Sequence, residues 1–127
     1  MIMSKNFFVK RERGKPFIAR DGALIFELLR PETSDIRNLS VASGYLKPKQ
    51  KALPHYHKKS EEVYYVISGD GKVRIGDNVE KISEGSAAHI PAGVVHALEN
   101  MSTKTEMRIL AISAPPYSDD DIFFVDK

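Results

Sequence analysis

Two histidines lie one residue apart in the stretch HYHKKSEEVYYVISGDG, residues 55–71. In a β-strand His55 and His57 would project from the same face, because successive side chains alternate between the two faces. Glu62 opens the next expected strand and can bring a carboxylate to that face if the residues between form a turn. His96 is placed to return a third imidazole to the same point. Imidazole nitrogens combined with a carboxylate oxygen are typical ligands of a transition metal.

Two further residues are candidate catalytic groups. His89 could line the pocket as a proton shuttle, or it could be a structural histidine bonded to the backbone. Tyr64 is expected on the same strand face as Glu62, where it could hydrogen-bond a substrate or simply fill the interior. Arg74 and Arg108 are possible anchors for a carboxylate or phosphate, and each could equally be a solvated surface residue.

The elements that must position these side chains are short and rich in β-forming residues. No helical periodicity is sustained anywhere in the chain, which favours an all-β antiparallel sandwich or small barrel. Gly69-Asp70-Gly71 and Gly76-Asp77-Asn78 have the composition of tight hairpin turns. The expected strands fall within residues 23–29, 39–46, 62–68, 72–75, 79–82, 86–90, 94–99, 107–113 and 122–125.

The composition restricts both partners and chemistry. The chain has 127 residues, enough for one domain, with 19 basic and 17 acidic residues and a net charge of +2. This balance gives no case for a nucleic acid or a membrane as partner, and no segment is apolar enough for a signal peptide or membrane span, so we expect a cytoplasmic protein. The absence of cysteine means that a metal must use histidine nitrogens or carboxylate oxygens.

Two stretches of the chain resemble the two signature motifs of the cupin superfamily. The first motif reads G-x5-H-x-H-x(3,4)-E-x6-G, and the second reads G-x5-P-x-G-x2-H-x3-N. The opening glycine of the first motif falls on Lys49, which leaves the shape of that loop open. The first motif is matched by His55, His57, Glu62 and Gly69, and the second by Gly85, Pro91, Gly93, His96 and Asn100.

The resemblance implies a single cupin barrel, also called a double-stranded β-helix or jelly roll. It implies a divalent transition metal (Fe, Mn, Ni, Co or Zn) held by His55, His57, Glu62 and His96, with open positions for a small molecule. The implied function is a metalloenzyme acting on a small oxygenated molecule, a keto acid or sugar, by isomerisation, decarboxylation or oxygenation. The alternative is a non-catalytic module that binds or senses a small ligand or a metal.

The ends of the chain lead to an expectation about assembly. Residues 1–16 are expected to form an N-terminal arm, and residues 17–127 the barrel domain. Residues 118–121 look like a solvated turn before the apolar segment 122–125. Small cupins resemble dimers with packed sheets, so we expect a homodimer, with the terminal segments or the strand face that carries Val63, Tyr65 and Ile67 at the contact. The alternative is a monomer whose ends fold back onto its own barrel.

Overall fold

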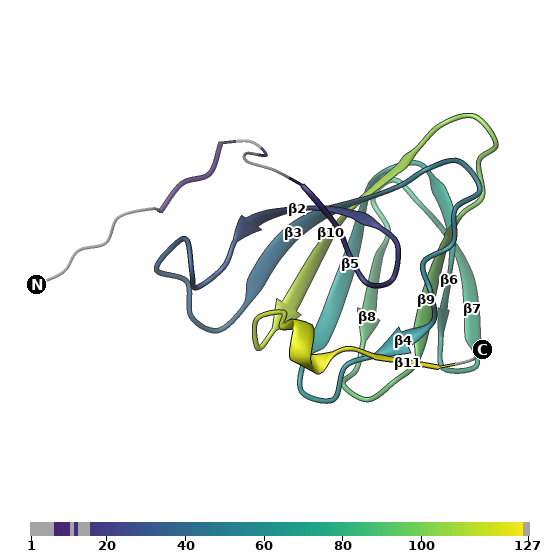
Figure 1. Cartoon of the computed structure of the whole chain (residues 1–127). Coiled ribbons are helices and arrows are strands. Elements are labelled where there is room, and N and C mark those ends of the chain that lie inside the picture. Colours follow the sequence, from purple (N-terminus) through teal and green to yellow (C-terminus); the bar gives the residue numbers. More distant parts are fainter. Residues whose placement is uncertain (1–6, 11, 13–15, 126–127) are drawn as a thin grey trace, which may run out of the picture.

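Two antiparallel sheets face each other in the computed structural model (Figure 1), which describes residues 7–10, 12 and 16–125. One sheet has the strand order β1 (Phe17–Ile18), β2 (Leu24–Leu29), β3 (Ser40–Leu46), β10 (Met107–Ala114), β5 (Glu61–Ser68), β8 (Ala87–Ile90). The other sheet has the order β11 (Phe123–Phe124), β4 (His55–Tyr56), β9 (His96–Asn100), β6 (Asp70–Ile75), β7 (Asn78–Ser83).

The all-β architecture confirms the fold class expected from the sequence. Each of the nine expected runs contains a strand, and β1 and β4, of two residues each, are additional. The helical structure among the described residues is a 3-10 turn at Asp119–Asp121, and no helix there is long and apolar enough to cross a membrane.

The turn at Gly69 differs from the expected hairpin. β5 pairs with β10 and β8, whereas β6 pairs with β7 and β9, so the chain crosses from one sheet to the other at this point. Gly69 has a φ of +106°, which favours glycine. A Cβ atom on Gly71 would lie 2.6 Å from the Met107 side chain. These two glycines therefore permit a close crossover, while Gly76 does lie in the expected hairpin, between β6 and β7.

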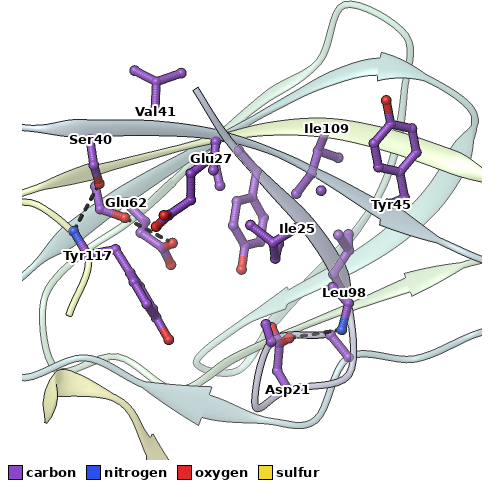
Figure 2. Close-up of a pocket in the computed structure, with 18 of the residues that line it drawn as sticks. Asp21, Ile25, Glu27, Ser40, Val41, Tyr45, Glu62, Leu98, Ile109 and Tyr117 are labelled. Carbon is purple, nitrogen blue, oxygen red and sulfur yellow. Dashed lines mark hydrogen bonds between the residues drawn. The ribbon is translucent and has the colours of Figure 1, made fainter. Parts of the chain in front are cut away.

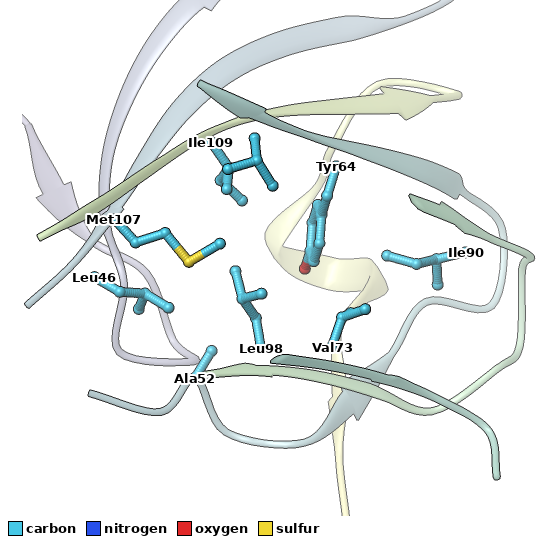
Figure 3. Packing of buried hydrophobic residues seen from close by; sticks show 9 residues of the cluster. Leu46, Ala52, Tyr64, Val73, Ile90, Leu98, Met107 and Ile109 are labelled. Atoms are coloured by element: carbon cyan, nitrogen blue, oxygen red, sulfur yellow. The ribbon is translucent and has the colours of Figure 1, made fainter. Parts of the chain in front are cut away.

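The hydrophobic core lies between the two sheets (Figure 3). Tyr64 and Val66 of β5 face inward, as their alternation with exposed or half-buried neighbours predicts. The apolar sequence of the outer face suggested that this face is covered. Tyr65, on that face, is 40 % exposed, so a single chain leaves it partly uncovered. The buried core residues are Leu46, Ala52, Tyr64, Val66, Val73, Ile90, Leu98, Met107 and Ile109.

The C-terminal segment packs against its own barrel. The monomeric alternative predicted this position for the C-terminal end. β11 pairs with β4, and Ile122 is buried. The expectation of a solvated turn at residues 118–121 is wrong for Asp121, which is 6 % exposed. Its carboxylate accepts hydrogen bonds from the backbone N–H groups of three successive residues, Lys58, Lys59 and Ser60. The turn is therefore a structural clamp on the β4–β5 loop.

The predicted N-terminal arm lies mainly outside the described residues. Glu12, which is described, accepts hydrogen bonds from the hydroxyls of Ser43 and Tyr45 on β3, and Arg108 of β10 lies 3.4 Å from its carboxylate. These contacts attach this point of the arm to the outer face of the first sheet.

Candidate metal centre

Four buried side chains converge between the sheets from three strands and one loop. His55 belongs to β4 and His57 follows that strand, Glu62 lies on β5, and His96 opens β9. His55 and His96 are paired directly across β4 and β9. Each of the four residues offers one ligand atom, and these atoms all lie within 4.8 Å of one another. The structure thus brings together all four residues that the sequence singled out, in a group that could hold a metal ion.

Backbone carbonyls orient the three imidazoles. Nδ1 of His55 lies 2.7 Å from the Leu53 carbonyl, Nδ1 of His57 lies 2.6 Å from the Asp121 carbonyl, and Nδ1 of His96 lies 3.1 Å from the Val94 carbonyl. A carbonyl only accepts, so each of these contacts requires the proton on Nδ1 and leaves Nε2 with a free lone pair in the neutral ring. Such hydrogen bonds orient metal-ligating histidines in proteins.

The polar atoms at the centre of the group fit a cation. His57 Nε2 and His96 Nε2 lie 3.3 Å and 3.2 Å from Oε1 of Glu62, and all three atoms are buried without a well-formed hydrogen bond. Buried polar atoms that lack partners are costly, and a metal ion bound to all three would remove that cost. The chemistry of the donor set, imidazole nitrogen and carboxylate oxygen, suits a divalent transition metal.

The electrostatics of the group also prepare the carboxylate for a cation. Burial alone would raise the pKa of Glu62, but the adjacent imidazoles of His57 and His96 outweigh burial and lower this pKa to about 2. Burial opposes protonation of His57, yet its contact with Glu62 raises the His57 pKa overall. Burial, followed by the proximity of His96, lowers the pKa of His55. Glu62 is therefore ionised and His55 neutral at neutral pH.

A cavity opens beside the group, over the inner face of β2, β3 and β10 (Figure 2). Asp21, in the turn before β2, lies across the cavity from Glu62, and its Oδ2 is 3.9 Å from Nε2 of His55. Oδ1 of Asp21 accepts a hydrogen bond from the Ala23 backbone N–H, which fixes the carboxylate. The sequence reasoning missed Asp21, because no spacing in the chain relates this turn to either motif.

The two candidate catalytic residues lie in different environments. Tyr64 lines the cavity, and its ring centroid is 5.9 Å from that of His96. Burial, with a smaller contribution from Glu62, raises the pKa of Tyr64 well above its ordinary value, so its hydroxyl stays protonated. His89 is exposed on the outer face of β8, where its Nε2 lies 2.8 Å from Glu61. The structure therefore does not bring His89 to the cavity, because alternation along β8 points it away from the interior.

The two candidate anion anchors do not line this cavity either. Arg108 lies beside Glu12 on the outer face of the first sheet. Arg74 belongs to β6 and borders a separate surface depression with Gly76 and Asp77.

Comparisons with known proteins agree with this fold. A family model described as "Cupin domain" matches residues 44–113. The chain is 33 % identical, over 95 % of its length and 96 % of the relative, to an uncharacterized protein of Methanocaldococcus jannaschii.

Two solved structures show the same fold at lower identity. KdgF from Halomonas sp. matches with a TM-score of 0.74 and 17 % identity, covering 91 % of this chain and 97 % of that protein. A predicted oxalate decarboxylase from Thermotoga maritima matches with a TM-score of 0.66 and 24 % identity, covering 73 % of this chain and 80 % of the other.

Proposed function

Because this chain belongs to the cupin family, we propose that it is a metal-binding single-domain cupin that acts on a small oxygenated molecule, a keto acid or a sugar. In this proposal the metal ligands are His55, His57, Glu62 and His96. The observation that carries it is the convergence of their four ligand atoms within 4.8 Å, three of them buried without a hydrogen bond.

The chemistry of such a centre depends on which divalent metal it holds. Bound iron, manganese, nickel, cobalt or zinc would supply Lewis acidity for isomerisation or decarboxylation of a carbonyl compound, or, for a redox-active metal, the electrons for oxygenation. Four protein ligands leave room for a substrate oxygen on the cavity side.

Residues of the chain itself would complete the site. The protonated hydroxyl of Tyr64 can donate a hydrogen bond to a substrate oxygen but cannot act as a base near neutral pH. Asp21 offers a carboxylate on the cavity side of His55, where it could accept or return a substrate proton. The apolar walls formed by Ile25 and Ile109 would exclude water from the reacting molecule.

A non-catalytic role, binding or sensing a small ligand or a metal, is the second candidate. It is favoured by the positions of the two sequence-predicted catalytic residues. His89 lies outside the cavity, and Tyr64 has a pKa too high for a base. Besides Glu62, the described carboxylates of the cavity lining that are left for proton transfer are those of Asp21 and Glu27. Turnover that persists without the Asp21 carboxylate would contradict the proton-transfer role given to it.

Elemental analysis of protein purified without a polyhistidine tag tests the proposed metal centre. We expect close to one transition-metal ion per chain, and a loss of about tenfold or more in metal affinity for His57→Ala. His89→Ala is the matched control, because it removes an exposed histidine outside the group and should keep its metal. Equal metal content in all three proteins would show that the ligands are wrongly assigned.

Activity measurements on the metal-loaded protein separate the two candidate functions. Dioxygen consumption, and turnover of keto acids and keto sugars, should both be recorded with the identified metal. Turnover that is lost in His57→Ala supports the enzyme. Binding of acids or sugars without turnover supports the binding module.

A further inference from the structure

The cavity beside the metal group is acidic. Three carboxylates line it, those of Asp21, Glu27 and Glu62, whereas no lysine or arginine lines it among the described residues. One oxygen of Glu27 lies 2.7 Å from Arg30, so part of its charge is neutralised, but that arginine is not part of the lining. Arg20, close to Asp21 in the chain, is engaged outside the cavity with the Asp119 carbonyl and the ring of Phe124.

Much of the remaining lining is apolar. Figure 2 shows Glu27, Glu62 and Tyr117 together on one side, and Ile25, Ile109 and Leu98 on the other. Small residues of neighbouring strands widen the apolar side. A Cβ atom on Gly44 would lie 3.3 Å from the Ile25 side chain, so glycine at this position leaves space for the side chains of Ile25 and Ile109. The small and apolar residues of the lining include Ala23, Leu29, Ala42 and Ala111.

These features favour binding of ligands with one negative charge over ligands with two or more. One acidic group can be neutralised by the metal ion. A second carboxylate or a phosphate would enter a partly dehydrated space that offers it Asp21 and Glu27 and no described cation, so its loss of hydration would not be compensated. An alkyl group in the same place would instead cover Ile25 and Ile109 and displace water from them, which is favourable.

We propose, on the premise of the metal centre assigned above, that the site takes small oxo acids with one metal-binding carboxylate and an uncharged, largely apolar remainder. Asp21 and Glu27 are its specificity-determining residues, since they exclude dicarboxylates and phosphorylated compounds. Ile25 and Ile109 provide the contact for the apolar remainder.

Binding of three probe acids to the cobalt(II)-loaded protein tests this proposal. The probes are pyruvate, 2-oxopentanoate and 2-oxoglutarate, and the readout is the change in the cobalt absorption spectrum, which requires no turnover. The last two acids have equal chain length and differ in one end, a methyl group against a carboxylate. We expect 2-oxopentanoate to bind about tenfold tighter than either of the other two acids, because it buries more apolar surface than pyruvate and carries one charge fewer than 2-oxoglutarate.

Charge-removing variants identify the residues responsible. Asp21→Asn retains an oxygen for the Ala23 N–H, and Glu27→Gln retains the shape of its side chain. Each should reduce the discrimination against 2-oxoglutarate at least threefold, and the double variant should reduce it further. Glu84→Gln, which changes an exposed carboxylate elsewhere on the surface, should have no effect.

The outcomes distinguish this proposal from the one it rests on. Failure of the unmodified protein to bind cobalt(II) would overturn the metal centre itself. If cobalt(II) binds, the specificity proposal is overturned by equal or tighter binding of 2-oxoglutarate, by a spectrum that none of the three acids changes, or by discrimination that survives in the double variant.

Discussion

Three backbone carbonyls determine which nitrogen of each histidine is available to a metal. Because the carbonyls of Leu53, Val94 and Asp121 each lie at an Nδ1 atom, the three Nε2 atoms are directed to the centre of the group. If the imidazole rings were rotated by 180° about their Cβ–Cγ bonds, the Nε2 atoms would no longer point to the centre, and the same residues would form an ordinary polar cluster. The orientation of the side chains, rather than their identity alone, makes the group suitable for a cation.

Proton release on metal binding is expected from the raised pKa of His57. To bind a metal, His57 must lose the proton that makes its ring cationic. Its raised pKa keeps that proton bound at pH values near and below 6.5, the ordinary pKa of histidine. Glu62, with a pKa of about 2, has no proton to release there, and the lowered pKa of His55 makes its contribution smaller than that of His57. Zinc affinity should therefore increase as pH rises through the pKa of His57.

Calorimetric titration with zinc in two buffers of different ionisation enthalpy measures this release. Roughly half a proton or more per metal should leave at pH 6.5, and less at pH 8. Metal binding with no proton release at pH 6.5 would contradict the raised pKa.

Lys49 occupies the position at which the family motif has glycine, and it adopts the backbone conformation that glycine favours, with a φ of +62°. A side chain at positive φ costs about 1–2 kcal/mol, while glycine loses about 0.5–1 kcal/mol more chain entropy on folding. Lys49→Gly should therefore raise the free energy of unfolding by about 0.5–1 kcal/mol, measured by urea denaturation. Lys47→Gly, in the same loop but without a positive φ, should lower it.

Among the elements, the C-terminal segment supports the metal group at two points. Its 3-10 turn brings the Asp121 carboxylate to the β4–β5 loop and the Asp121 carbonyl to His57. β11 then continues along β4, and the Phe124 ring lies 5.8 Å from that of His55. One segment at the end of the chain thus contacts two of the four residues in the group.

Asp121→Ala should weaken both folding and metal binding. The substitution leaves three backbone N–H groups near the metal group without their acceptor, and we expect a loss of about 2 kcal/mol in the free energy of unfolding. Zinc affinity should fall about tenfold, because the backbone carbonyl that orients His57 remains in the variant but the turn that carries it is no longer anchored to the β4–β5 loop. Asp120→Ala, at the exposed neighbouring position, is the control and should change neither quantity. Unchanged zinc affinity in Asp121→Ala would mean that the turn is not coupled to the site.

On the scale of the whole molecule, the outer face of the larger sheet carries a group of apolar side chains on β5 and β10. Leu110 and Ile112 of β10 are paired with Tyr65 and Val63 of β5, so all four side chains lie on one face of the sheet. These side chains are exposed or half-buried in the single chain. A second copy of the chain docked there would cover them.

We predict a homodimer through this face. Sedimentation at micromolar concentration should give about twice the 14.2 kDa mass of one chain. Tyr65→Glu should return the mass to that of a monomer, because it places a charge at the contact. Deletion of residues 122–127 should not by itself dissociate the dimer, since β11, the strand removed, pairs within its own chain. A monomeric mass for the unmodified protein would contradict the prediction.

Much of the fold could be predicted because alternation and turn residues act locally. Nine of the strands were recognisable as runs of the sequence, and the two-residue strands β1 and β4 were not. The spacing of His55 and His57 places both side chains on one face of an extended chain, whereas the arrival of Glu62 at that face depends on the loop between β4 and β5. His96 was found through the second motif. The sequence alone therefore determined the class of fold and the four side chains that could meet.

Only the tertiary structure decided which other groups surround the four side chains of the metal group. Asp21 and Glu27 reach the cavity from β2 and the turn before it, and Asp121 reaches His57 across 64 positions of the chain, distances that no local pattern records. His89 has the same chemistry as the other histidines but sits on the outer face, and Gly69 crosses between sheets rather than closing a hairpin. Local sequence specifies the backbone conformation and the face of each strand, whereas long-range pairing and packing decide which faces are opposed, and the acidity of the cavity is a property of those opposed faces.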